Sequence, residues 1–235
     1  MSNISVVIPC YPPHIKYLRN TIIDIANQTL PPKEIILAIS GINKTLEATI
    51  YNKFNKILQD KNMIFKIIST NLQQYAGINR NMGVKLAECE YIMFIDADDN
   101  IHPQKIEIIK YYLDKYNPNV LIHNHVKRAY RKIFNKIITN YTIANVTTND
   151  HIRKATFRNS ADYKPDGKNI IGIRIPRKNA NVTHGYPTVK KSIFETISYT
   201  NMKRAQDCVF LTDILWNIGG MIHVNLKLVN IRPKK

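Results

Sequence analysis

The sequence contains few cysteines and no long apolar run. Its three cysteines, Cys10, Cys89 and Cys208, are far apart and show no Cys-x-x-Cys spacing, which argues against a disulfide framework or a zinc knuckle. No apolar stretch approaches the roughly 18–20 residues that a membrane-spanning helix needs. The N-terminus opens on a strand pattern, without the basic and apolar regions of a signal peptide. We therefore expect a soluble, cytoplasmic protein in a reducing compartment.

Two nucleotide-binding motifs are also missing. No Gly-x-Gly-x-x-Gly follows the first apolar run, and no Gly-Lys-Ser or Gly-Lys-Thr occurs, so neither a dinucleotide-binding fold nor a P-loop is supported. Acidic residues are scarce as well, with 17 Asp and Glu against 34 Lys and Arg and a net charge of +17. Such a surface attracts anions, for example nucleotides, nucleic acid or acidic glycans.

The excess of positive charge is concentrated in one segment. Residues 127–178 contain thirteen Lys and Arg but only three Asp, a net charge of +10. We expect a basic insertion at about residues 127–180 and leave two interpretations open. It is either a solvated, partly mobile insertion or an arm that binds an acidic or phosphate-bearing partner.

The apolar pattern predicts an α/β fold. Strand-like apolar runs alternate with amphipathic helices, and the continuous rather than alternating runs are typical of a mostly parallel central sheet sandwiched by helices. Ligands of such sheets bind at the carboxyl ends of the strands, where Tyr11, Ser40 and Asn71 would lie. In the first half the predicted strands are 5–9, 34–39, 63–69 and 91–95, and the predicted helices are 15–28, 46–58 and 77–87. Beyond residue 100 the predicted helices are 106–116, 189–197 and 204–216, and the predicted strands are 120–122 and 222–231.

Three carboxylates, Asp96, Asp98 and Asp99, directly follow the apolar run 91–95. Two acids at one strand end repel each other unless a cation or a donor-rich ligand lies between them, which favours a divalent metal. The alternative is that these acids cap the next helix, since Asn100 and Pro103 resemble a helix start. We prefer the metal because capping requires one side chain and not three.

The chain resembles the family 2 glycosyltransferases, inverting enzymes of the GT-A fold with an Asp-x-Asp motif. Residues 77–83 and 90–99 are most similar to that family's pattern, and the likeness covers roughly the first 100 residues well. Weaker matches follow at Gly185, Lys191, 194–195 and 206–207. The resemblance implies one GT-A domain over 1–235, with a nucleotide-sugar-binding half at 1–100 and an acceptor-side half at 101–235.

This resemblance also implies an activity. A sugar would move from a nucleotide-diphosphate sugar, with a UDP-sugar as the expected donor, to a hydroxyl of a glycan or glycoprotein acceptor by single displacement, with Mn²⁺ or Mg²⁺ at the departing diphosphate. Asp98 would bind the metal directly, Asp96 would hold the ribose or a metal-bound water, and Asp99 would reach the metal shell or the acceptor. The implied donor contacts are Pro9, Tyr11, Ser40, Asn79, Arg80, Asp96 and Ala97.

The reaction also needs a general base for the attacking hydroxyl. Beyond residue 180 the only carboxylates are Glu195, Asp207 and Asp213, and Asp207 matches the family's base position. Asp207 could instead only complement the helix dipole. Departures from the family pattern include Ser40 in place of an acid and Gln206 before the base. The competing hypotheses are therefore a catalytically inactive glycosyltransferase-like module and a polyanion- or nucleic-acid-binding module.

Overall fold

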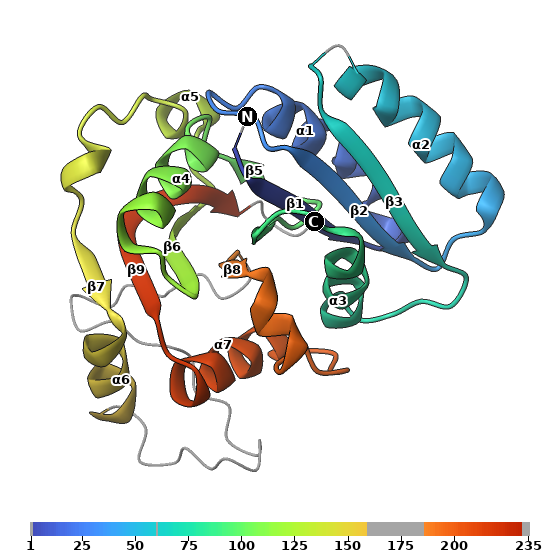
Figure 1. Ribbon diagram of the computed structural model, residues 1–235. Helices are drawn as coiled ribbons and strands as arrows, with labels where there is room; N and C mark the ends of the chain where they lie inside the picture. The colour runs from blue at the N-terminus through green and yellow to red at the C-terminus, as the bar shows by residue number, and fades with distance from the viewer. Residues whose placement is uncertain (1, 60, 159–185, 232–235) are drawn as a thin grey trace.

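The computed structural model describes residues 2–59, 61–158 and 186–231. Its first half is a run of parallel strands joined by helices, as predicted (Figure 1). The strands pair in the order β3, β2, β1, β4, and all of these pairs are parallel. The elements are β1 (Ile4–Cys10), α1 (Ile15–Ala26), β2 (Glu34–Ser40), α2 (Lys44–Gln59), β3 (Ile64–Thr70), α3 (Ala76–Leu86) and β4 (Tyr91–Phe94).

The second half extends the same sheet. Strand β8 pairs antiparallel with both β4 and β6, so β6 runs in the same direction as β4 and ends at the same edge of the sheet. The full order is β3-β2-β1-β4-β8-β6-β9-β5, with β7 also paired to β9. The elements are β5 (Asn100–Ile101), α4 (Lys105–Tyr116), β6 (Val120–Lys127), α5 (Arg131–Phe134), β7 (Val146–Thr148), α6 (Asn149–Arg158), β8 (Thr188–Lys190), α7 (Gln206–Asn217) and β9 (Met221–Ile231).

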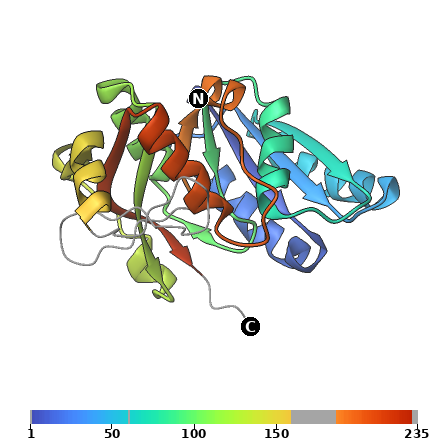
Figure 2. The ribbon, with the colours of Figure 1, turned by 90° about the horizontal axis from the view of Figure 1, so that it is seen from below.

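The sheet is covered on both faces. Leu18 of α1, Phe54 of α2 and Ile109 of α4 belong to one buried cluster with alternate residues of the strands. Val84 of α3 and Phe210 of α7 belong to the cluster on the other face. The segment between β8 and α7 lies between helices α3 and α7 in both views (Figures 1 and 2). Because strand side chains alternate between faces, the continuous apolar strands seen in the sequence fill both clusters.

Three sequence predictions in the second half are corrected. The helix predicted at 189–197 is wrong, because this stretch forms β8 followed by a short 3₁₀ helix (Lys191–Glu195). Val189 pairs with Ile92 of β4, and this long-range pairing overrides the local helical spacing. The strand predicted at 120–122 extends to Lys127, since its polar residues pair with β9.

The third correction concerns the acids after β4. They do not cap a helix, because residues Asn100–Ile101 form β5 and α4 begins only at Lys105, with Gln104 as its N-cap residue. The capping alternative is therefore wrong. The carboxylates of Asp96 and Asp98 lie in a loop between two strands, β4 and β5, with no helix start among them.

The described part of the basic segment, residues 127–158, is anchored to the rest of the protein. The Arg131 guanidinium pairs with the buried carboxylate of Asp24 in α1. The hydroxyl of Tyr141 donates to Glu107 in α4 at 2.9 Å, and β7 pairs with β9. The segment is therefore tied to the core at these points although most side chains of residues 127–153 are exposed, and both interpretations of the insertion stay predictions. Residues 159–180 lie outside the described residues. Within the described part of the chain, no helix has the length and apolar character needed to cross a bilayer.

Candidate functional site

The candidate site lies at the sheet edge where the parallel strands end. Tyr11 directly follows β1, Ser40 is the last residue of β2, Asn71 directly follows β3, and the acids begin two residues after β4. Because β1 to β4 are parallel neighbours, these positions share one edge, as the sequence pattern predicted. Pro9 lies within β1, and Ala97 is buried with its carbonyl oxygen accepting from Thr21 at 2.8 Å.

An ion pair between Asp96 and Arg80 forms the centre of this edge. The Arg80 Nη2 donates to Asp96 Oδ1 at 2.8 Å, with the arginine side chain 3% exposed and the aspartate side chain 30% exposed. Burial raises the pKa of Asp96, and the charges of Asp98 and Asp207 raise it further, whereas Arg80 acts in the opposite direction. The Nε and Nη1 atoms of Arg80 have no hydrogen-bond partner among the described residues. Because these two atoms are also buried, Arg80 supplies a fixed positive charge beneath the strand edge and not donors open to solvent.

Aromatic packing holds Arg80 in place. Its guanidinium lies 5.3 Å from the centre of the Tyr199 ring, which in turn stacks on Phe210 of α7 at 4.0 Å. Gly77 allows the loop that carries Tyr199 to pack closely on α3, because a Cβ atom at this position would lie 2.9 Å from the carbonyl oxygen of Thr200. Sequence reasoning missed Tyr199, since no local pattern distinguishes an aromatic residue in a loop from an ordinary core residue.

Asp207 comes from the distant end of the chain to the same cluster. It lies in the first turn of α7, where its Oδ1 accepts from the backbone NH of Cys208 at 3.0 Å. Its charge acts on both Arg80 and Asp96. The structure thus brings two carboxylates from opposite halves of the chain to one arginine. One carboxylate lies at the strand edge, and the second, partly exposed, lies on the helix side.

Ser40 and Asn79 take supporting positions. Both are buried, and Asn79 Nδ2 donates to the carbonyl oxygen of Cys10 at 2.8 Å and to Ser40 Oγ at 3.0 Å. The backbone NH of Gln74 also donates to Ser40 Oγ at 3.0 Å. These bonds tie the ends of β1 and β2 to α3. A direct donor contact by Ser40 or Asn79 stays a prediction.

Asp99 differs from the expectation that it reaches the metal shell or the acceptor. Its side chain is buried, and its Oδ2 accepts a hydrogen bond from the hydroxyl of Tyr186, just before β8. The carboxylate therefore faces the protein interior and connects the acidic loop to the strand β8. The expectation was wrong because three closely spaced acidic positions give no local signal of which side chain turns inward.

Asp98 is partly accessible and lies beside His14, a residue that the sequence analysis did not predict to be part of the site. Its Oδ2 lies 3.7 Å from His14 Nε2, and the two side chains are 20% and 26% exposed. The His14 ring lies against that of Tyr11, with centroids 4.3 Å apart. The sequence feature that could have identified His14 is its position, because it lies three residues after Tyr11, which directly follows the first strand.

A divalent metal fits this edge only together with a ligand. In the residues that the structure describes, no group of three or more His, Cys, Asp or Glu side chains is arranged to hold a metal ion by itself. Mg²⁺ at diphosphate sites is usually bound by one or two carboxylates, with substrate phosphates and water completing its coordination. The partly exposed oxygens of Asp96 and Asp98 match that chemistry.

Lys105 is a buried cation beneath the acidic loop. Its side chain is inaccessible, its Nζ lies 5.4 Å from the centre of the Tyr186 ring, and that atom has no hydrogen-bond partner among the described residues. Burial lowers the pKa of Lys105 to about 7, and the charges of Asp96 and Asp99 only partly offset this effect. The cost of burying the ammonium therefore exceeds its attraction to the acids.

We expect Lys105→Met to stabilise the fold by roughly 1–4 kcal/mol at pH 6, because methionine has no charge to desolvate and the lowered pKa shows that desolvation outweighs the attraction of the acids. The folded pKa lies below that of the unfolded lysine, so the unfolded state binds more protons between about pH 7 and 10.5 and wild-type stability rises with pH across that window. The advantage of the variant should be constant below about pH 7 and shrink above it. Urea unfolding at pH 6 and pH 9 in the presence of EDTA measures the difference in free energy of unfolding between the variant and wild type. Lys110→Met, on the same helix, is the control. A less stable Lys105→Met protein at pH 6 contradicts the prediction.

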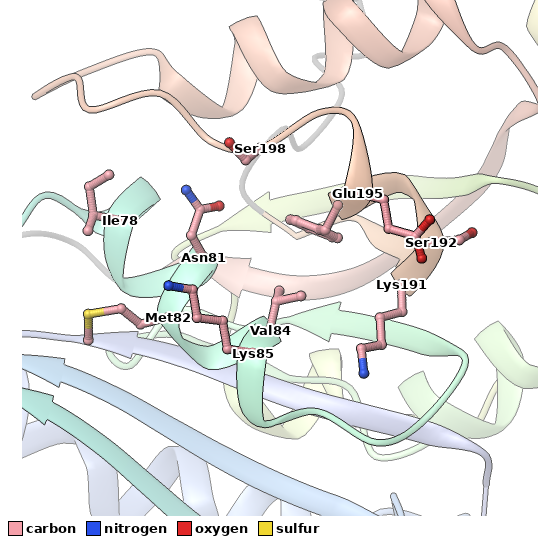
Figure 3. A pocket seen from close by; sticks show the side chains of 10 residues that line it. Ile78, Asn81, Met82, Val84, Lys85, Lys191, Ser192, Glu195 and Ser198 are labelled. Carbon is pink, nitrogen blue, oxygen red and sulfur yellow. The ribbon is translucent and has the colours of Figure 1, made fainter.

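A separate cavity of about 700 Å³ lies between α3 and the 3₁₀ helix after β8 (Figure 3). Apolar Ile78, Met82 and Phe194 line it together with Lys85 and Lys191. None of the residues predicted to bind donor or metal contributes to it. The cavity therefore does not belong to the strand-edge site, although both use α3.

The mostly parallel sheet covered by helices on both faces defines a fold of the GT-A type. The family model described as "Glycosyl transferase family 2" matches residues 5–197, and the chain belongs to that family. The resemblance inferred from residues 77–83 and 90–99 is thereby confirmed.

Individual relatives agree with this assignment. An uncharacterised glycosyltransferase of Methanocaldococcus jannaschii is 33% identical over 104 residues, which cover 44% of this chain and 34% of the relative. The poly(ribitol-phosphate) β-N-acetylglucosaminyltransferase TarP of Staphylococcus aureus is 26% identical over 218 residues, or 92% of this chain and 58% of the relative. The crystal structure of S. aureus TarS 1-349 in complex with UDP-GlcNAc superposes with a TM-score of 0.69 at 16% identity, covering 100% of this chain and 59% of that structure. This chain thus spans about a third to three fifths of the length of these relatives.

Proposed function

We propose that this protein is a metal-dependent, inverting glycosyltransferase that moves a sugar from a UDP-sugar to a hydroxyl group of a glycan or glycoprotein acceptor. The observation that supports this most directly is the close packing of Gln206, next to Asp207, on Gly77 of α3, the helix that carries Arg80 of the Arg80–Asp96 ion pair. A carboxylate suited to accept a proton lies close to a positive charge suited to a diphosphate. Residues 1–100 would bind the donor, and residues 101–235 would bind the acceptor.

The reaction would be a single displacement. The acceptor oxygen forms a bond to the anomeric carbon of the sugar while the bond from that carbon to the diphosphate oxygen breaks, and the bonding electron pair leaves with the nucleoside diphosphate. Asp207 takes the proton of the acceptor hydroxyl. The fixed positive charge of Arg80 would help to offset the negative charge that grows on the diphosphate. Tyr11 would pack against the base.

Asp98 would bind Mn²⁺ or Mg²⁺ directly at the diphosphate, and Asp96 would bind the ion through a water molecule. When bound, the ion would supply positive charge that offsets the charge on the leaving group. Pro9 and Ala97 flank the same edge through their backbone positions in β1 and after β4. The role of Asp96 would be indirect, since its Oδ1 is already engaged by Arg80.

The acceptor would be acidic or phosphate-bearing. Lys127 and Arg128 are exposed at the end of β6, a strand that runs in the same direction as β4 and ends toward the same sheet edge. Cations at this edge would attract a polyanionic chain toward the donor. TarP, named for transfer of N-acetylglucosamine to poly(ribitol-phosphate), is consistent with such an acceptor.

A donor screen tests the proposal. Thermal unfolding is measured with UDP- and GDP-sugars, UDP-N-acetylglucosamine first, with Mn²⁺ or EDTA, and release of the nucleoside diphosphate is followed in parallel. A donor at about 100 times its Kd should stabilise the protein by about 2.7 kcal/mol, and only when metal is present. Stabilisation without any turnover would identify a catalytically inactive module. Binding to DNA or heparin without any donor effect would identify a polyanion-binding module instead.

A further inference from the structure

His14 is held at the strand edge with its outer nitrogen toward Asp98. It ends the 3₁₀ turn Pro12–His14 shortly after β1, and its ring centroid lies 4.3 Å from that of Tyr11 and 6.2 Å from that of Tyr17. The 3.7 Å between His14 Nε2 and Asp98 Oδ2 is too long for a hydrogen bond. Two metal-binding groups therefore face each other, partly open to solvent.

The separation of these two atoms suits a shared ion. Nitrogen and oxygen ligands of first-row divalent ions lie about 2.0–2.2 Å from the metal, so two neighbouring ligands are roughly 3.0–3.5 Å apart. A change of well under about 1 Å would bring His14 and Asp98 to that distance. Asp96 is less free to move, because its Oδ1 is bound to the buried Arg80.

We propose that His14 is a nitrogen ligand of the divalent ion, beside Asp98, and that it makes the site select Mn²⁺ or Co²⁺ over Mg²⁺. The inference rests on the metal dependence of the proposed function. Its physical basis is ligand chemistry. Mg²⁺ binds oxygen almost exclusively, whereas imidazole suits the transition ions and strengthens their binding along the first row. Without His14 the same edge presents only carboxylate oxygen, which does not discriminate against Mg²⁺.

The experiment measures metal binding directly, with UDP as the only nucleotide. Free Mn²⁺ is quantified by its EPR signal, and Mg²⁺ competes for the same site. We expect His14→Asn to weaken Mn²⁺ binding about tenfold, the equivalent of about 1.4 kcal/mol, while the apparent Kd for Mg²⁺ changes less than about threefold. His14→Asp, which supplies oxygen in place of nitrogen, should shift the selectivity toward Mg²⁺. His151→Asn, an exposed histidine on α6, is the matched control and should match wild type.

Pulsed EPR gives a second readout that does not depend on affinity. Wild-type protein with Mn²⁺ and UDP should show coupling to a directly bound imidazole nitrogen, and His14→Asn should lose it while His151→Asn retains it. Wild-type binding of Mn²⁺ with no nitrogen coupling and no effect of His14→Asn overturns the inference and leaves the proposed function standing. Absence of Mn²⁺ binding to the wild-type complex overturns both.

Discussion

Asp207→Asn is expected to lower kcat for sugar transfer by about 10²–10⁴-fold while leaving the donor Kd within about threefold. The amide keeps the size and the hydrogen bond to Cys208 but cannot accept the proton of the acceptor hydroxyl. A loss of about 10³-fold corresponds to about 4 kcal/mol of transition-state stabilisation. Steady-state transfer rates and donor-induced thermal shifts measure the two quantities separately.

Asp213→Asn provides the matched control for Asp207. Asp213 lies six residues further along the same helix, so it points in a different direction from Asp207, and burial raises its pKa. If Asp213 were the base, its variant would lose transfer and Asp207→Asn would retain it. Full transferase activity of Asp207→Asn would exclude Asp207 as the base.

Asp98→Asn is expected to abolish metal-dependent donor binding. An amide is nearly the same size as a carboxylate but lacks the charge that attracts a divalent cation, so we expect Mn²⁺ affinity in the presence of UDP to fall by about two orders of magnitude. The stabilisation by UDP and Mn²⁺ should disappear, while the unfolding temperature without ligands should change little because Asp98 is partly exposed. Calorimetric titration of Mn²⁺ measures the affinity, with thermal unfolding alongside.

Asp114→Asn serves as the control for this variant. Asp114 is an exposed acid on α4 that pairs with Lys110, so its removal changes the net charge equally without touching the strand edge. If both variants weaken Mn²⁺ binding equally, a general charge effect explains the result and Asp98 is not a metal ligand. The sugar donor should bind wild type and Asp114→Asn with the same metal dependence.

The first half of the fold was readable from sequence because its signals are local. The strands at β1, β2, β3 and β4 are continuous apolar runs, and each connecting helix has apolar residues at helical spacing. Parallel strands joined by helices then fix which ends share an edge, so the apolar pattern alone was enough to place the acids after β4 beside Tyr11. The place of Asp207 in the first turn of an apolar helix was likewise predicted, whereas its role as the base came from the family resemblance and stays a prediction.

The second half was predicted less well because its strands depend on distant partners. Thr188–Lys190 is too short to show a strand pattern and is held by pairing to both β4 and β6. The polar residues 123–127 are strand only because β9 lies beside them. Such pairings join positions far apart in the chain, and no local periodicity encodes them.

The sequence by itself determined the chemistry that this protein offers: strand-end carboxylates, an arginine near the start of a helix, a late aspartate and a strongly basic middle segment. Only the tertiary structure decided how those groups are used. It turned Asp99 inward to Tyr186, buried Lys105 beneath the acidic loop, and set His14 opposite Asp98. The physical reason is that residue type sets what a side chain can bind, whereas its direction and burial depend on the packing of elements far apart in the chain.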